Sequence, residues 1–185
     1  RILSFSAKDY KGVTYYHKLE EETDVAERTL LINIIGIIAN YGIISGWHSE
    51  GFDMPYIKDR CDSLSVDYTI LDYVNHLCYL LLFKKYDKKS RPSFKLNDIA
   101  FEVLKERKVE QEKGKGAIYN TWKNNPEQLK KYNVEDSNLV YKINQKRSFI
   151  EVSMKRADNA HCHVRNTMNA GDSGDFLLMN GYKES

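Results

Sequence analysis

The sequence predicts a mixed α/β domain, and three patterns along the chain carry that prediction. A hairpin-like pair of strands comes first, a short buried strand follows the first helix, and most of the remainder has helical spacing. Elements in this order pack as a sheet with helices against it. The 185 residues, 42% of them apolar and 29% charged, suffice for one domain with its own core and exclude a disordered chain.

The N-terminal stretch reads as a β-hairpin followed by a helix. Residues 1–8 mix apolar and small polar side chains, and residues 13–16 are β-branched or aromatic, with a turn signal between them. Asp24 and Glu27 have the spacing of a capping box, and the apolar repeat behind them predicts a buried helix to about Asn40.

The next part of the chain is expected to hold one strand and two helices. Residues 43–47 are short and apolar, as a buried strand is, and residues 54–64 predict a helix with Pro55 in its first turn. Apolar residues between 68 and 82 recur at helical spacing, which predicts one continuous helix there.

Beyond residue 82 the pattern indicates a basic loop and two more helices. The loop covers residues 84–92, and an amphipathic helix is expected over residues 96–106. Asn125 followed by Pro126 is typical of a capped helix start, and the apolar repeat continues to Ile143. Towards the C-terminus the pattern loosens, apart from a glycine-bearing turn.

Charge is unevenly distributed along the chain. Residues 1–80 carry 7 Lys and Arg against 12 Asp and Glu, whereas residues 81–147 carry 17 against 9. The basic middle stretch therefore offers a face for a polyanion such as nucleic acid. A solvated helical surface is the alternative explanation.

The cysteines and the hydropathy indicate the compartment. Cys61, Cys78 and Cys162 are widely spaced and odd in number, which favours a reducing intracellular compartment, the cytoplasm or nucleoid. No apolar run reaches the roughly 18 residues of a membrane-spanning helix, so no membrane partner is expected.

Two acidic residues stand in positions suited to chemistry. Asp53 follows the strand and its glycine-bearing turn, where sites assemble in open α/β sheets, although it could simply cap the next helix. Asp136 shares a helix face with Tyr132 and with inward apolar residues, so it needs a metal, a cation or a donor unless it is an ordinary surface acid.

Two weaker patterns are set aside. His161, Cys162 and His163 are metal-capable, but their spacing is not that of a zinc site and no fourth ligand is evident. Residues 114–116 are rich in glycine without the pattern of a phosphate loop, so they read as a turn.

Three stretches together resemble the 3'–5' exonuclease (proofreading) domain of family B DNA polymerases. Ile43–Asp62 contains Gly-Trp-His-Ser-Glu-Gly-Phe-Asp, similar to the family's Gly-Trp-Asn-x-x-x-Phe-Asp; Arg91–Val109 resembles the segment before the last motif; and Tyr132–Asp136 matches Tyr-x-x-x-Asp. The resemblance implies a ribonuclease-H-like fold, a mixed β-sheet flanked by helices, for residues 1–147. Residues 148–185 resemble the connection towards a polymerase palm that is absent from the chain.

The resemblance also implies roles for single residues. Asp53 would help to hold a second metal ion, Asp136 would ligate the first, and Tyr132 would orient the attacking water. The expected cofactor is Mg²⁺ or Mn²⁺, the reaction is two-metal phosphodiester hydrolysis, and the partners are single-stranded DNA with a primer 3' end and the rest of the polymerase. Contacts to nucleic acid are expected from His48, Phe52, Tyr56, Arg91, Ser93 and Phe94, with core packing as the alternative for Phe52.

The chain departs from the family at two places. His48 replaces the family's Asn, which puts the substrate contact in doubt and introduces a group able to titrate near neutral pH. The family's first motif, a strand with Asp-x-Glu, is not evident, and the match of Asp72 to a further family acid is loose. Either Ser6 and Lys8 stand where those acids belong, or the motif strand precedes Arg1, the explanation we favour.

Two functions follow from these expectations. The first is part of a proofreading exonuclease whose isolated chain has low or no activity, because its metal site is incomplete. The second is an inactivated exonuclease-like module that binds DNA or braces a polymerase. A stand-alone nuclease of the same superfamily fits less well, because of the palm-like C-terminal stretch.

Overall fold

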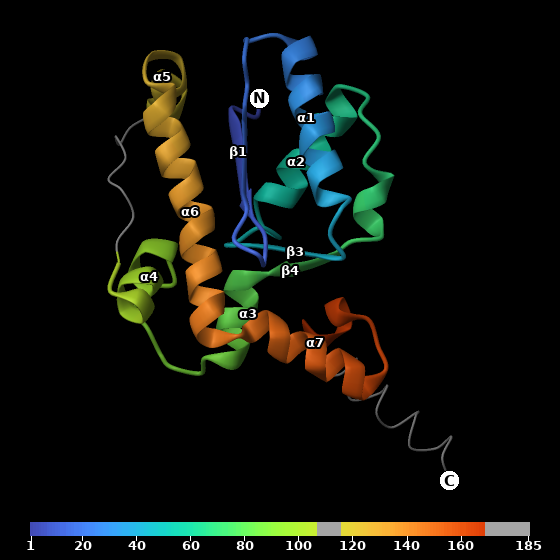
Figure 1. Cartoon of the computed structure of the whole chain (residues 1–185), viewed down its shortest axis with the longest axis vertical. Coiled ribbons are helices and arrows are strands. Elements are labelled where there is room, and N and C mark those ends of the chain that lie inside the picture. The colour runs from blue at the N-terminus through green and yellow to red at the C-terminus, as the bar shows by residue number, and fades with distance from the viewer. Residues whose placement is uncertain (107–115, 169–185) are drawn as a thin grey trace.

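The computed structural model describes residues 1–106 and 116–168, shown in Figure 1. The elements follow in the order β1 (Ser4–Lys8), β2 (Thr14–Lys18), α1 (Asp24–Ile38), β3 (Ile43–Gly46), α2 (Asp53–Ser63), a 3₁₀ turn η1 (Thr69–Asp72), β4 (Asn75–Cys78), α3 (Tyr79–Tyr86), α4 (Leu96–Leu104), α5 (Ala117–Asn124), α6 (Pro126–Arg147), α7 (Phe149–Ala160) and a second 3₁₀ turn η2 (Val164–Met168).

The described strands form two separate pairs. β1 and β2 are the predicted antiparallel hairpin, with Ser4 opposite Lys18, and β3 and β4 run parallel, with Ile43 opposite Asn75. In Figure 1 the long helix α6 lies alongside the hairpin, and α1 and α2 lie on its other side. Parallel and antiparallel pairing with helices around it confirms the predicted mixed α/β class.

Two apolar clusters hold these elements together. The first joins the hairpin to α1 and α2 and includes Leu31 and Ile34, and the second joins β4, α3, α4 and α6 and includes Leu82, Leu139 and Ile143. All five are fully buried. Burial of one such side chain contributes about 1.5–3 kcal/mol, so the inward faces of α1 and α6 fix where these helices sit.

β1 meets α6 through a row of polar contacts. Ser6 Oγ donates to the carbonyl of Asn133 at 2.7 Å and lies against the hydroxyl of Ser137. Lys8 Nζ donates to the side-chain oxygen of Asn138 at 2.7 Å. Alternate residues of β1 therefore face α6, while its other face packs on the first apolar cluster. We call this contact the β1–α6 seam.

The prediction of one continuous helix over residues 68–82 is wrong. The chain there forms η1, then β4, and enters α3 only at Tyr79. β4 pairs with β3 along its length and its last residues, Leu77 and Cys78, are buried. β4 reads Asn-His-Leu-Cys, so only its last two residues are apolar and buried. Together with Leu71 and Val74 before β4 and Leu81 and Leu82 in α3, these two residues recur at helical spacing although they lie in different elements.

The start of α1 also differs from the prediction. Thr23, and not Asp24, is the N-cap, and its hydroxyl accepts the backbone N–H of Ala26 at 3.1 Å. Glu27 is fully buried rather than turned back to the helix start. In addition, α5 and α7 form where the sequence pattern predicted no helix, and the expected turn at residues 171–174 lies outside the described residues.

Candidate functional site

The turn between β3 and α2 is held in a single shape by hydrogen bonds. The buried Ser49 donates its hydroxyl to the carbonyl of Gly46 at 3.0 Å and accepts from His76 Nε2 at 2.8 Å. Its own carbonyl accepts the N–H of Met54 at 2.9 Å. Burial lowers the pKa of His76, which favours the neutral form of its ring. The turn that carries the motif residues is therefore rigid.

His48 projects from this turn. Its φ of 60° lies in the left-handed region, which few residues other than glycine and asparagine adopt readily, and the residue is exposed. It follows Trp47, whose ring packs against Tyr79 and Phe83 in the core. The backbone therefore turns sharply between a half-buried and an exposed side chain, which presents the imidazole to solvent.

Asp53 is the first residue of α2. The residue keeps exposed surface, yet protein atoms crowd its carboxyl group, and this desolvation raises its pKa against the opposing effects of its own backbone N–H and of His48. A desolvated carboxylate at a site open to solvent gains from a bound cation. The chemistry of Asp53 thus suits a ligand of a hard metal ion.

An aromatic pair lies beside Asp53. Phe52 is 63% exposed and Tyr56 is 37% exposed, and their rings stack with centroids 6.0 Å apart and planes 2° apart. The Tyr56 hydroxyl donates to the carbonyl of Arg1 at 3.1 Å, which fixes that ring. The alternative of core packing for Phe52 is wrong. An exposed aromatic face next to an acid is suited to stack on a nucleobase.

Tyr132 and Asp136 lie four residues apart on α6, so they share a face as the sequence predicts. Both are partly buried, and the Oδ1 atom of Asp136 is shielded from solvent. Within residues 1–106 and 116–168, no three His, Cys, Asp or Glu side chains group as a metal ion needs. Among the described residues, Asp53 and Asp136 therefore belong to no group of three such side chains.

Arg91 is occupied within the fold. Its side chain is 5% exposed, it bonds Asp87 at 2.9 Å and Glu102 at 2.7 Å, and its guanidinium stacks over Phe83 with 5.0 Å to the ring centroid. A contact to phosphate would require it to exchange these partners. Sequence spacing could not reveal the ion pairs, because Glu102 belongs to α4 and meets the loop only in the folded chain.

The neighbours of Arg91 lie next to the motif turn. The carbonyl of Phe94 accepts the indole N–H of Trp47 at 3.1 Å, and Lys84 Nζ lies 5.2 Å from the centre of the Phe94 ring. Ser93 Oγ accepts the N–H of Lys95 at the start of α4. The structure thus brings this predicted segment beside the turn of His48. Residues 107–115 of the basic middle stretch lie outside the described residues.

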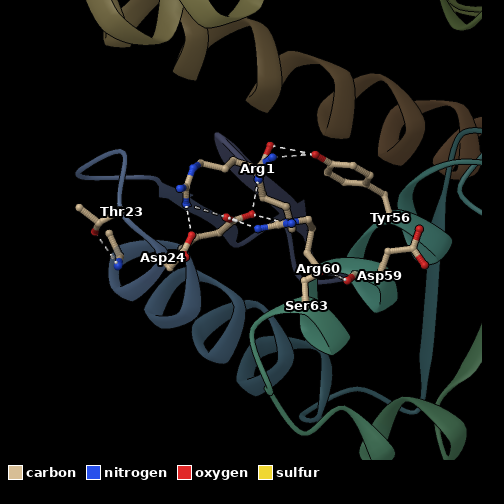
Figure 2. Close-up of polar contacts among 10 residues, drawn as sticks. Arg1, Thr23, Asp24, Tyr56, Asp59, Arg60 and Ser63 are labelled. Carbon is tan, nitrogen blue, oxygen red and sulfur yellow. Dashed lines mark hydrogen bonds and ion pairs between the residues drawn. The ribbon is translucent and has the colours of Figure 1, made fainter.

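An ionic network that the sequence pattern did not predict lies at the C-terminal end of α2, opposite to the end that carries Asp53. Glu27 is fully buried and accepts two hydrogen bonds from Arg60, both 2.8 Å, and one from the N–H of Ile2, also 2.8 Å (Figure 2). Arg1 adds a contact at 3.2 Å. Desolvation raises the pKa of Glu27, but these donors outweigh it and hold the pKa below its usual value. The inward face of α1, where Glu27 interrupts apolar residues, was the available signal.

Two remaining candidates lie apart from these elements. Asp72 is exposed at the end of η1, with Lys58 at 3.6 Å. His161, Cys162 and His163 line an open cavity of about 780 Å³ beyond α7. Within residues 1–106 and 116–168, no helix is long and apolar enough to cross a membrane.

Comparison with protein families identifies the architecture. The model of the RNase_H superfamily matches residues 2–147, which run from the start of the hairpin to the end of α6. The match includes the turn of Asp53 and the helix of Asp136. The ribonuclease-H-like fold expected from the motifs is therefore confirmed.

Three known proteins are similar in sequence. The DNA-directed DNA polymerase of Enterobacteria phage T4 is 26% identical over 184 residues, covering 85% of this chain and 20% of the polymerase. That of Escherichia phage RB69 is 24% identical, covering 77% and 18%. The DNA polymerase of Methanocaldococcus jannaschii is 23% identical, covering 95% and 12%. The chain thus spans a fifth or less of each of these relatives.

Proposed function

Since the chain belongs to the RNase_H superfamily, we propose that it forms the 3'–5' exonuclease (proofreading) region of a family B DNA polymerase. One observation carries the proposal: Phe52 and Tyr56 form an exposed stack at the start of α2, and between them in the sequence lies Asp53, whose carboxyl group is desolvated. Stacking faces hold single-stranded bases, and carboxylates hold the cations that phosphodiester hydrolysis uses. The similarity to three DNA polymerases supports the same assignment.

The proposed roles keep to the chain's own side chains. Asp53 and Asp136 hold divalent cations, Mg²⁺ or Mn²⁺, and Tyr132 orients water from its place one helical turn before Asp136. The cations supply Lewis-acid stabilisation of the hydrolysis. His48, Phe52 and Tyr56 bind the 3' end of single-stranded DNA. Phe94 and Ser93, tied to the motif turn through Trp47, extend that surface.

The two strand pairs support an additional strand as the source of the remaining carboxylates. β1 and β3 each pair with one described strand and no ladder joins them. A strand that paired with both would make one continuous sheet and would carry side chains into the region between Asp53 and α6. We propose that the Asp-x-Glu motif of the family is on such a strand and that this chain by itself hydrolyses DNA poorly or not at all.

The proposed domain organisation follows the same elements. Residues 1–147 form the exonuclease-type unit, which ends with α6. Residues 148–185 form the connection towards the polymerase palm, and α7 lies in that connection. The left-handed backbone of Ser148 marks the boundary between the two helices.

A specific contact favours a second candidate, an inactivated module that binds DNA. Ser6 and Lys8 face α6, and Lys8 Nζ bonds Asn138, two residues from Asp136. If β1 were the motif strand, a lysine would stand where an acid is needed and its charge would repel cations. The double substitution Ser6→Asp with Lys8→Glu separates the candidates. It restores Mn²⁺-dependent digestion if β1 is the motif strand, and restores none under the main proposal.

DNA binding is tested with the whole chain. A 5'-labelled oligothymidine is titrated with wild type, Phe52→Ala and a matched control, Tyr73→Ala, which removes another exposed aromatic ring. We expect binding that weakens roughly tenfold for Phe52→Ala only, since stacking contributes about 1–3 kcal/mol per base. Absence of binding by wild type would sink the proposal. Efficient digestion that Asp136→Asn abolishes would instead show that the metal site is complete without a further strand.

A further inference from the structure

The turn before α2 contains an unusually close approach between a glycine and a ring. A Cβ atom on Gly51 would lie 2.5 Å from Cε1 of His48, 2.8 Å from its Nε2 and 3.2 Å from its Nδ1. Real Cβ atoms essentially never come within 3.0 Å of such a neighbour. The Cε1 edge of the imidazole therefore lies over Gly51, and a side chain at position 51 displaces the ring, which is the far end of an exposed side chain and moves at little cost.

Hydrogen bonds fix the backbone of the turn, so the response to a side chain at position 51 falls on the His48 ring. The carbonyl of His48 accepts the N–H of Gly51 at 3.1 Å, so the two residues are joined across the turn. On one side Ser49 is locked between Gly46 and His76, and a Cβ on Gly46 would lie 3.0 Å from that of Ser49. Gly46 and Ser49 therefore lie in close contact within the turn, and the His48 ring occupies the space over Gly51.

The ring in this place lies near the candidate acid. The charge of His48 acts on Asp53, where it opposes the effect of desolvation. Imidazole N–H groups donate hydrogen bonds, and phosphate oxygens accept them. The imidazole is exposed and stands at the start of the helix that also presents Phe52 and Tyr56. The ring thus belongs to the turn that leads directly into the helix of Phe52 and Tyr56.

We propose that Gly51 is a positioning residue that leaves the space in which the His48 imidazole rests beside Asp53, and that the ring placed there binds the phosphate backbone of single-stranded DNA. The inference rests on the proposed function, because it needs DNA at the start of α2. Gly51 acts through His48, so its replacement matters only while the ring is present. This dependence makes the pair suitable for a double-mutant cycle.

The cycle uses Gly51→Ala, His48→Asn and the double variant. Asparagine tolerates the left-handed backbone, so the turn keeps its shape without the ring. Gly42→Ala is the matched control, because a Cβ on Gly42 meets nothing within 4 Å. Affinity for a 5'-labelled oligothymidine is measured by fluorescence anisotropy. We expect Gly51→Ala to weaken binding about tenfold, the factor of one hydrogen bond to a charged group, and to have no effect in the His48→Asn background.

A second readout follows the ring without DNA. The ¹H–¹³C resonances of the His48 imidazole are expected to shift in Gly51→Ala and to stay in place in Gly42→Ala. Equal weakening of DNA binding in both backgrounds, or unchanged ring resonances in Gly51→Ala, would overturn the proposal. A wild-type chain that binds no oligothymidine overturns the DNA contact together with the proposed function, and the ring resonances then still decide whether Gly51 positions His48.

Discussion

The two ends of α2 provide opposite surroundings for a carboxylate. At its C-terminal end, Arg60 reaches the buried Glu27 with two hydrogen bonds, and the backbone of Ile2 adds a third. At its N-terminal end, Asp53 accepts from its own backbone, and no described lysine or arginine forms an ion pair with it. One acid has its pKa lowered by donors, and the other has its pKa raised by desolvation.

This difference separates an acid that stabilises the fold from an acid left available for chemistry. Glu27 is buried and fully supplied with donors, so its charge holds α1, α2 and the start of β1 together. Asp53 is placed on a rigid turn without comparable donors, which the fold tolerates at a functional site more readily than elsewhere. Four substitutions or conditions test this division.

The largest effect is expected from Glu27→Gln. Removing one partner of a buried ion pair leaves the other charge without compensation, so the free energy of unfolding falls by about 3 kcal/mol. Chemical denaturation followed by circular dichroism measures it. Asp24→Asn is the control, because Asp24 also pairs with Arg1 but is 69% exposed, and such pairs contribute about 0–1 kcal/mol. Equal losses in both variants would contradict the structural role of Glu27.

Acid should remove the same contribution. The pKa of Glu27 in the folded state lies below its usual value of 4.5, so its stabilisation is complete above that pH and is lost as the pH falls through the folded-state pKa. The difference in stability between wild type and Glu27→Gln should therefore begin to shrink as the pH falls below about 4.5 and should vanish only below the folded-state pKa. Curves that stay equally far apart down to pH 2 would show that the charge of Glu27 contributes nothing.

Asp53→Asn should change stability little. Its raised pKa means that the ionised carboxylate is not favoured by folding, whereas an acid in the first turn of a helix is favoured by the helix dipole. The two effects oppose one another, so we expect a change within about 0.5 kcal/mol at pH 7. A loss above about 2 kcal/mol would place Asp53 with Glu27 among the structural acids. The same denaturation assay gives the answer.

The smallest effect on folding is expected from Phe52→Ala. The ring is 63% exposed, and substitutions at such positions usually stay within about 0.5 kcal/mol. Thermal unfolding of this variant should match wild type even though its DNA binding is weakened. A marked drop in the melting temperature would indicate that Phe52 packs in the core. The N-terminal end of α2 would then no longer differ from the C-terminal end as the functional one.

The sequence predicted best those elements that local chemistry determines. The hairpin, α1, β3, α2, α4 and α6 follow from apolar periodicity, turn residues and the cap at Asn125. The resemblance in three ordered motifs led to the superfamily that the family comparison confirms. The placement of Asp53 at the start of α2 and of Tyr132 and Asp136 on one helix face also needed only local spacing.

Features that depend on distant parts of the chain could not be predicted. β4 reads as a helix until its pairing with β3 is known, and the ion pairs of Glu27 with Arg60 and of Arg91 with Glu102 join different elements. The close approach of the His48 ring to Gly51 depends on side-chain placement within a turn, which apolar periodicity does not describe. Whether the site residues act as expected stays a prediction for the experiments above.

The β1–α6 seam has a consequence for the order of events during synthesis. Ser6 and Ser137 are separated by 131 positions, so at about 5–20 residues per second the ribosome delivers α6 roughly 7–26 seconds after β1. Throughout that interval one face of the hairpin is not covered by α6. On β1 that face carries the hydroxyl groups of Ser4 and Ser6 and the amino group of Lys8, and β2 adds the ring of Tyr16 opposite Ser6. The nascent hairpin therefore exposes a mostly polar surface, which water solvates, until α6 arrives.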